Sequence, residues 1–99
     1  MQVTVRYFDG CPNWKEADAR LRAALVATET TATILYERVE LQAEAERLRF
    51  TGSPTILIDG SDPFPAESAS YGLTCRIYRT ETGNQGSPSV KQLEDALQL

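Results

Sequence analysis

Asp9-Gly10-Cys11-Pro12-Asn13-Trp14 joins a strand pattern to an amphipathic helix pattern, and it is the most informative segment of the chain. The preceding residues 3–8 alternate between two sets of side chains, which predicts a strand with at least one buried face. Pro12 suits the first helical position, since its missing N–H would have no intrahelical partner there. The sulfur of Cys11 then lies beside unpartnered backbone N–H groups at the positive end of the helix dipole. We therefore expect a Cys11 thiolate with a lowered pKa, and we expect the chemistry of the chain at this sulfur.

The size and composition of the chain indicate a single domain over residues 1–99. Its 99 residues are 41% hydrophobic, which suits one small core. The 14 acidic and 10 basic residues leave a net charge of −4 without a basic run, so we predict no nucleic-acid partner and no membrane partner. The absence of histidine removes the commonest general base and the usual zinc ligand, so no zinc site is predicted.

Cysteine usage and hydropathy favour a cytoplasmic location. Two cysteines are too few for the disulfide scaffold of a small secreted domain. The apolar runs span three or four residues, far short of a membrane-spanning helix. The chain starts with a strand pattern rather than a basic segment followed by an apolar one, so no signal peptide is expected.

Periodicity along the chain predicts the element order β-α-β-α-β-β-α. One face of the first helix carries Trp14, Ala17, Leu21, Ala24 and Leu25. Ser89 followed by Gln92 indicates a capping box that begins the last helix. Residues 61–73 are rich in proline and small polar residues and predict a long loop, a candidate functional insert. The predicted strands are 3–8, 33–36, 55–58 and 74–79, the predicted helices are 12–28, 40–49 and 89–98, and 83–88 is predicted to be a flexible turn.

These features together resemble the thioredoxin-like family over nearly the whole chain. Cys11 lies at the junction of the first strand and the first helix, where that family keeps its nucleophilic cysteine. Ser53-Pro54-Thr55 follows about forty residues later, directly before the third predicted strand, where the family has its cis-proline. The order of the elements is that of the minimal fold of the family.

The resemblance implies an α/β fold and a set of roles. A thioredoxin-like domain has a four-stranded mixed sheet flanked by three helices, here in the strand order 33–36, 3–8, 55–58, 74–79. The first two strands would be parallel and the other two antiparallel to their neighbours, with helix 40–49 packed on the sheet opposite helix 12–28. Cys11 is expected to be the attacking thiolate, and Ser53–Pro54 a cis peptide close to it. The backbone edge of Ser53, with Pro54, is expected to bind a substrate segment.

Trp14 stands where the family has its resolving cysteine in a C-x-x-C motif. The local dithiol–disulfide cycle of a thioredoxin is therefore impossible, and Cys11 is expected to be reduced or to carry an adduct. We interpret Trp14 as a core residue on the buried helix face; the alternative is a substrate-binding residue that partly covers the thiolate. Asp9-Gly10 is interpreted as a turn, with a proton relay through Asp9 as the alternative.

Cys75 lies near the start of the fourth predicted strand. In the expected fold it would be on the order of 10–15 Å from Cys11, at about 3.3 Å per strand residue. A disulfide needs Cα atoms within about 7 Å, so separation of the two sulfurs is the prediction. The alternative is that the 61–73 insert carries Cys75 towards the first helix, where it would be a resolving thiol and Arg76 would stabilise a thiolate.

Three functions remain open. The leading one is a thiol–disulfide oxidoreductase of the monothiol type, in which Cys11 attacks a protein disulfide, a peroxide or another electrophilic sulfur. A small thiol or Cys75 then resolves the mixed disulfide, and no cofactor is needed. The second is a soft-metal binder, since two thiolates without histidine suit linear Hg(II) or Cu(I). The CPxW and late Cys-Arg patterns are also similar to thioredoxin-like proteins grouped with mercury and organomercurial handling. The third is a redox-inactive module that binds a peptide, or a second copy of itself as a homodimer, through Pro54 and loop 61–73.

Overall fold

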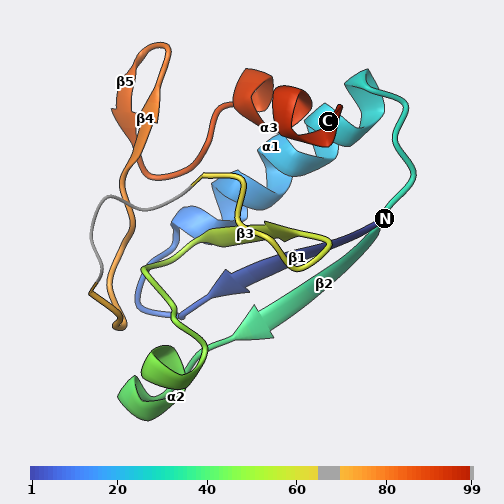
Figure 1. The fold of residues 1–99 in the computed structure, drawn as a ribbon. Helices are drawn as coiled ribbons and strands as arrows, with labels where there is room; N and C mark the ends of the chain where they lie inside the picture. Colours follow the sequence, from blue (N-terminus) through green and yellow to red (C-terminus); the bar gives the residue numbers. More distant parts are fainter. Residues whose placement is uncertain (65–69, 99) are drawn as a thin grey trace.

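The fold is mixed α/β, and the computed structural model describes residues 1–64 and 70–98. Part of the predicted 61–73 loop therefore lies outside the described residues. The elements follow one another along the chain as in Figure 1: β1 (Gln2–Tyr7), α1 (Asn13–Ala27), β2 (Thr33–Arg38), α2 (Gln42–Arg47), β3 (Thr55–Ile58), β4 (Tyr78–Thr80), β5 (Gly83–Gln85) and α3 (Val90–Leu97).

The main sheet has three strands in the order β2-β1-β3. β1 is parallel to β2 and antiparallel to β3, and Val3 lies opposite Ile34 on one side and Ile58 on the other. The predicted order and direction of these three strands are confirmed. Alternation along β1 buries Val3 and Val5 on one face, as the sequence pattern requires.

Helices α1 and α3 pack against each other over that buried face of the sheet (Figure 1). The apolar stripe of α1 is buried as predicted, and Leu93 of α3 is fully buried beside it. This arrangement produces one continuous core, made of Val3, Val5, Ala17, Leu21, Ala24, Leu25, Ile56, Leu93 and Leu97. The helix that begins just after Cys11 thus contributes Ala17, Leu21, Ala24 and Leu25 to this core.

Helix α2 is shorter than predicted and lies past the end of β2 (Figure 1). Ala45 is its buried residue, and it packs with Val39 and Phe50 in a second small cluster. Leu35 faces away from α1 and remains exposed, so α2 does not cover the sheet opposite α1 as expected. The reason is the composition of this segment, which offers too little apolar surface to span a sheet face.

The predicted four-stranded sheet is wrong. β4 pairs antiparallel with β5 in a separate two-stranded sheet, which also replaces the first part of the turn predicted for 83–88. The segment before β4 meets the main sheet through an isolated parallel bridge between Cys75 and Ser53. Because the bridge is parallel, this segment cannot continue as an antiparallel neighbour of β3. The segment around Cys75 therefore runs in the opposite direction to the one predicted for residues 74–79.

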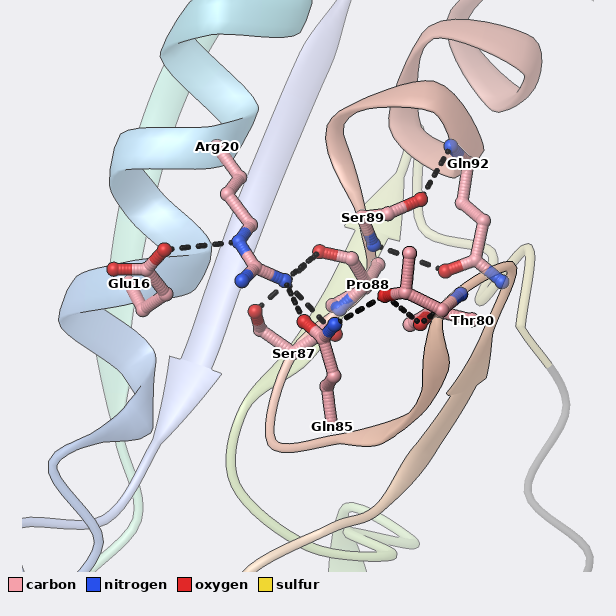
Figure 2. A network of polar contacts seen from close by, with 9 residues as sticks. Glu16, Arg20, Thr80, Gln85, Ser87, Pro88, Ser89 and Gln92 are labelled. Atoms are coloured by element: carbon pink, nitrogen blue, oxygen red, sulfur yellow. Dashed lines mark hydrogen bonds and ion pairs between the residues drawn. The ribbon is translucent and has the colours of Figure 1, made fainter.

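Arg20 of α1 holds the end of the β4–β5 hairpin against the helical layer (Figure 2). Its guanidinium donates hydrogen bonds to the Gln85 side chain at 2.7 Å and to the Pro88 carbonyl at 3.2 Å. Glu16, one turn earlier, accepts a further bond from Arg20 at 2.9 Å and orients it. These contacts tie the hairpin to α1, so that it packs beside the helices instead of on the sheet.

The capping box predicted at the start of α3 is confirmed (Figure 2). The Ser89 hydroxyl accepts the Gln92 backbone N–H at 3.1 Å, and the Gln92 side chain accepts the Ser89 N–H at 2.9 Å. The Gln92 side chain also donates to the Arg79 carbonyl at 2.6 Å, which links the cap to β4. Local sequence thus specifies both the helix start and its attachment to the hairpin.

Replacing Ser89 with alanine is expected to lower the free energy of unfolding by about 1 kcal/mol, because the Gln92 N–H loses its acceptor. Urea unfolding followed by circular dichroism measures the difference. The matched control is Ser61→Ala, at an exposed residue that pairs with Ile58 through backbone bonds only, and it is expected to be close to neutral. Equal effects of the two substitutions would contradict a stabilising role for the cap.

Candidate functional site

Cys11 lies at the predicted strand-to-helix junction and is fully buried, with 0% of its surface exposed. Its backbone N–H donates to the Phe8 carbonyl at 3.2 Å, which closes the tight turn between β1 and α1. Asp9 in this turn is exposed and pairs with Arg38 at 3.0 Å, in agreement with the turn interpretation. Pro12 directly precedes α1 with helical dihedral angles. The lowered pKa of the Cys11 thiol stays a prediction, because the sulfur is bonded to another sulfur and does not titrate.

The Ser53–Pro54 peptide is cis, as predicted. Ser53 is fully buried, and its carbonyl oxygen lies 3.7 Å from the Cys11 sulfur. Its hydroxyl accepts the Phe8 backbone N–H at 3.3 Å, which ties the proline loop to the Cys11 turn. The neighbouring Gly52 has a φ of +131°, and a Cβ there would come within 2.9 Å of the Arg76 Cβ, so this position requires glycine.

Cys75 forms a disulfide with Cys11, with the two Cα atoms 5.7 Å apart. The predicted separation of the two sulfurs and the predicted reduced state of Cys11 are therefore both wrong. The Ser53 N–H donates to the Thr74 carbonyl at 2.7 Å, and the Arg76 N–H donates to the Ser53 carbonyl at 2.8 Å. These two bonds place Cys75 directly beside Ser53 and hence within reach of Cys11. The alternative of a repositioned Cys75 is the one realised.

The segment after Cys75 alternates between exposed and buried side chains. Arg76 and Tyr78 are buried, whereas Ile77 between them is 71% exposed. The Arg76 guanidinium pairs with Asp62 at 2.8 Å and lies 4.4 Å from the centre of the Tyr78 ring. Arg76 is thus engaged by a carboxylate and an aromatic ring, and it anchors the segment that carries the cysteine.

Tyr78 and Asp62 are site residues that sequence reasoning missed. The Tyr78 hydroxyl donates to the Pro54 carbonyl at 2.5 Å, so it holds the cis-proline loop through a contact additional to those of Ser53. Burial raises the pKa of Tyr78, so its hydroxyl stays a donor throughout the physiological range. The alternation of residues 74–79 was the available signal for Tyr78, while nothing local marks Asp62 as the partner of Arg76.

Trp14 packs against the main core and stacks on Tyr7, with ring centroids 4.3 Å apart. The Tyr36 and Trp14 rings lie edge to face, with their centroids 6.3 Å apart. The indole is half-buried between β1, β2 and α1, so its contacts support the core interpretation. Its expected part in substrate binding stays a prediction.

The cysteine pair can exchange two electrons as a dithiol and a disulfide. In the reduced state it would offer two sulfur ligands to a soft metal ion. Within residues 1–64 and 70–98, no group of three or more cysteine, aspartate or glutamate side chains gathers to hold a metal ion. The chemistry that this arrangement supports most directly is thiol–disulfide exchange.

Comparison with known proteins gives no relative for this chain: no family model, curated protein or solved structure matches it. The thioredoxin-like resemblance therefore depends on the motifs and the element order alone. The chemical interpretation depends on the geometry around Cys11, Ser53 and Cys75.

Proposed function

We propose that this chain is a thioredoxin-like thiol–disulfide protein whose redox couple is Cys11 and Cys75. The observation that carries the proposal is the disulfide between them beside the cis-proline, with Cα atoms 5.7 Å apart. Trp14 occupies the position of the usual resolving cysteine, and Cys75 supplies the missing second thiol from another part of the chain. The expected monothiol mechanism is accordingly replaced by a dithiol one.

The arrangement of the main sheet supports the thioredoxin-like part of the proposal. The β2-β1-β3 order, the parallel first pair and the helix after Cys11 agree with what the resemblance implies. The return segment departs from it, because residues 74–76 pair with Ser53 and β4 leaves the main sheet. This departure is what brings the second cysteine to the first, so it supports the dithiol mechanism rather than opposing it.

The partner in the reaction is a small-molecule thiol or a protein dithiol. Two external thiolates reduce the disulfide in two exchange steps, and the products are an external disulfide and the Cys11 and Cys75 thiols. Electrons and protons balance within these sulfur groups, so the reaction requires no cofactor. In the opposite direction the reduced protein reduces an external disulfide.

The cytoplasm is the proposed compartment. Disulfides in cytoplasmic proteins are usually transient and catalytic or redox-sensing, which suits a couple that cycles. None of the helices within residues 1–64 and 70–98 combines the length and the apolar character needed to cross a bilayer.

Equilibration of the protein in glutathione buffers of varied thiol-to-disulfide ratio tests the redox couple. The expected result is one reversible transition in which the Cys11 and Cys75 thiols appear together, measured by alkylation and mass spectrometry. The control is Cys11→Ser, which cannot form the internal disulfide and is expected to take up one glutathione. A native protein whose disulfide resists both excess glutathione and dithiothreitol would contradict the proposal.

Soft-metal binding is the second candidate, and the closeness of the two cysteines favours it. Two thiolates from residues this near can bind one Hg(II) or Cu(I) ion in linear coordination. Titration of the reduced protein with Hg(II) is expected to give one equivalent bound by both sulfurs, and either single serine variant is expected to lose this two-sulfur site. A metal-binding protein that shows no reversible glutathione transition would replace the redox proposal with this one.

A further inference from the structure

The two cysteines of the disulfide differ in their exposure to solvent. Cys11 has 0% of its surface exposed, whereas Cys75 is an exposed residue. Thr74 and Ile77 are exposed as well, whereas Arg76 is buried, so a second molecule can approach Cys75 from the side of Thr74 and Ile77. A thiolate that enters from solvent therefore meets the Cys75 side of the disulfide.

The burial of Cys11 has a structural cause. Its backbone lies in the turn between β1 and α1, hydrogen-bonded to Phe8, and its sulfur lies against the Ser53 carbonyl. Phe8 also donates to the Ser53 hydroxyl, so the turn and the proline loop close over the sulfur together. Exchange requires that a thiolate approach the attacked sulfur directly, which this enclosure prevents at Cys11.

We infer that an external thiol attacks the Cys75 sulfur, that Cys11 leaves as the thiolate, and that the mixed disulfide forms on Cys75. The inference rests on the proposed redox couple and assigns roles within it. It reverses the roles that the resemblance implies, in which Cys11 attacks and the second cysteine resolves.

The first step is a balanced exchange. The attacking thiolate of a small thiol forms a bond to the Cys75 sulfur, the Cys11–Cys75 bond breaks, and its electron pair stays on Cys11. The leaving sulfur is the one at the N-terminus of α1, where the helix dipole favours negative charge. A second external thiolate then attacks the mixed disulfide and releases Cys75. In reverse, Cys75 attacks an external disulfide and Cys11 resolves the adduct.

The anchors of the Cys75 segment favour rapid resolution by Cys11. The backbone bonds from Ser53 to Thr74 and Arg76, and the ion pair of Arg76 with Asp62, do not involve the disulfide. They can persist in the mixed disulfide and keep Cys75 beside Cys11. Resolution is then an intramolecular step between groups already held close, which raises its effective concentration.

Thiol reactivity of two single variants tests the assignment. Cys11→Ser leaves the exposed Cys75, and Cys75→Ser leaves the buried Cys11. With 5,5′-dithiobis(2-nitrobenzoate) under native conditions, Cys75→Ser is expected to react at least about tenfold more slowly, because labelling of Cys11 needs a local opening. In urea the two variants are expected to react equally. A native Cys75→Ser that reacts as fast as Cys11→Ser, while circular dichroism shows both to be folded, would overturn the inference.

Trapping on the unsubstituted oxidised protein decides the question even if a variant fails to fold. The oxidised protein is exposed briefly to glutathione, quenched with acid, alkylated with N-ethylmaleimide and digested with trypsin. The digestion separates Cys11, in peptide 7–15, from Cys75, in peptide 50–76. We expect glutathione on peptide 50–76 and the maleimide on peptide 7–15. Glutathione on peptide 7–15 would reverse the assignment and leave the redox couple intact. Because Cys11 can resolve the adduct quickly, the couple itself is judged by its free thiols: maleimide on neither peptide after prolonged exposure to excess glutathione would overturn the couple, and the inference with it.

Discussion

Reduction of the Cys11–Cys75 disulfide is expected to lower the free energy of unfolding by about 4 kcal/mol. The two cysteines are 64 positions apart, so the bond closes a loop of nearly two thirds of the chain. In the chain-entropy account, a loop of that length removes much conformational freedom from the unfolded state. Stability and redox state are then coupled, since any partner that reduces the site also weakens the fold.

Urea unfolding of the oxidised protein and of the protein kept in dithiothreitol measures this effect. The double variant Cys11→Ser with Cys75→Ser is the matched control, because it has no disulfide under either condition and is expected to unfold identically in both. If oxidised and reduced wild-type proteins have equal midpoints, the loop closure contributes nothing and the prediction is wrong. A reduced protein that is fully unfolded at zero urea would place the stabilisation above the expected value.

Replacing Asp62 with asparagine is expected to lower the free energy of unfolding by about 3 kcal/mol, because it removes the carboxylate that neutralises a buried guanidinium. The Arg76 side chain is 5% exposed, while the Asp62 side chain is 25% exposed. Loss of one partner from a buried ion pair leaves the other charge without compensation, whereas the partial exposure of Asp62 admits some water and moderates the cost. The segment that carries Cys75 is expected to loosen with it.

The matched control for Asp62→Asn is Asp9→Asn, which breaks an ion pair at similar distance in an exposed setting. Asp9 is 66% exposed and pairs with Arg38 at 3.0 Å, so its loss is expected to cost less than about 1 kcal/mol. Denaturant unfolding measures both variants, and hydrogen exchange of the 74–78 amides reports on the segment itself. Equal destabilisation by the two substitutions would show that burial does not distinguish the pairs.

Much of the fold follows from local pattern. Alternation in residues 3–8, the helical stripe of α1 and the Ser89–Gln92 capping box each involve neighbours in sequence, and the structure contains all of them. The parallel β1–β2 pair follows because a helix connects the two strands, and β3 then joins β1 antiparallel. The cis Ser53–Pro54 peptide and the Cys11 junction were likewise predicted from motifs and spacing.

The sequence predicted the positions of some residues of the candidate site but not of others. Cys11 and Ser53 were placed correctly by the motifs that contain them. The prediction that Cys75 lies far from Cys11 was wrong, because it assumed that residues 74–79 run antiparallel to β3. The actual direction depends on the parallel bridge to Ser53 and on the Arg76–Asp62 pair, whose members are distant in sequence.

Sequence pattern was enough to predict the order and directions of β2, β1 and β3, helices α1 and α3, and the place of Cys11 between β1 and α1, because each depends on periodicity or on a short motif. Three features appear only in the folded structure: Cys75 is bonded to Cys11, β4 pairs with β5 away from the main sheet, and Cys11 is the buried cysteine of the pair. These features depend on hydrogen bonds and an ion pair between residues distant in sequence, which set the direction of the segment around Cys75. Its direction of return, which no local pattern encodes, determines both the strand pairing and the partner of the cysteine.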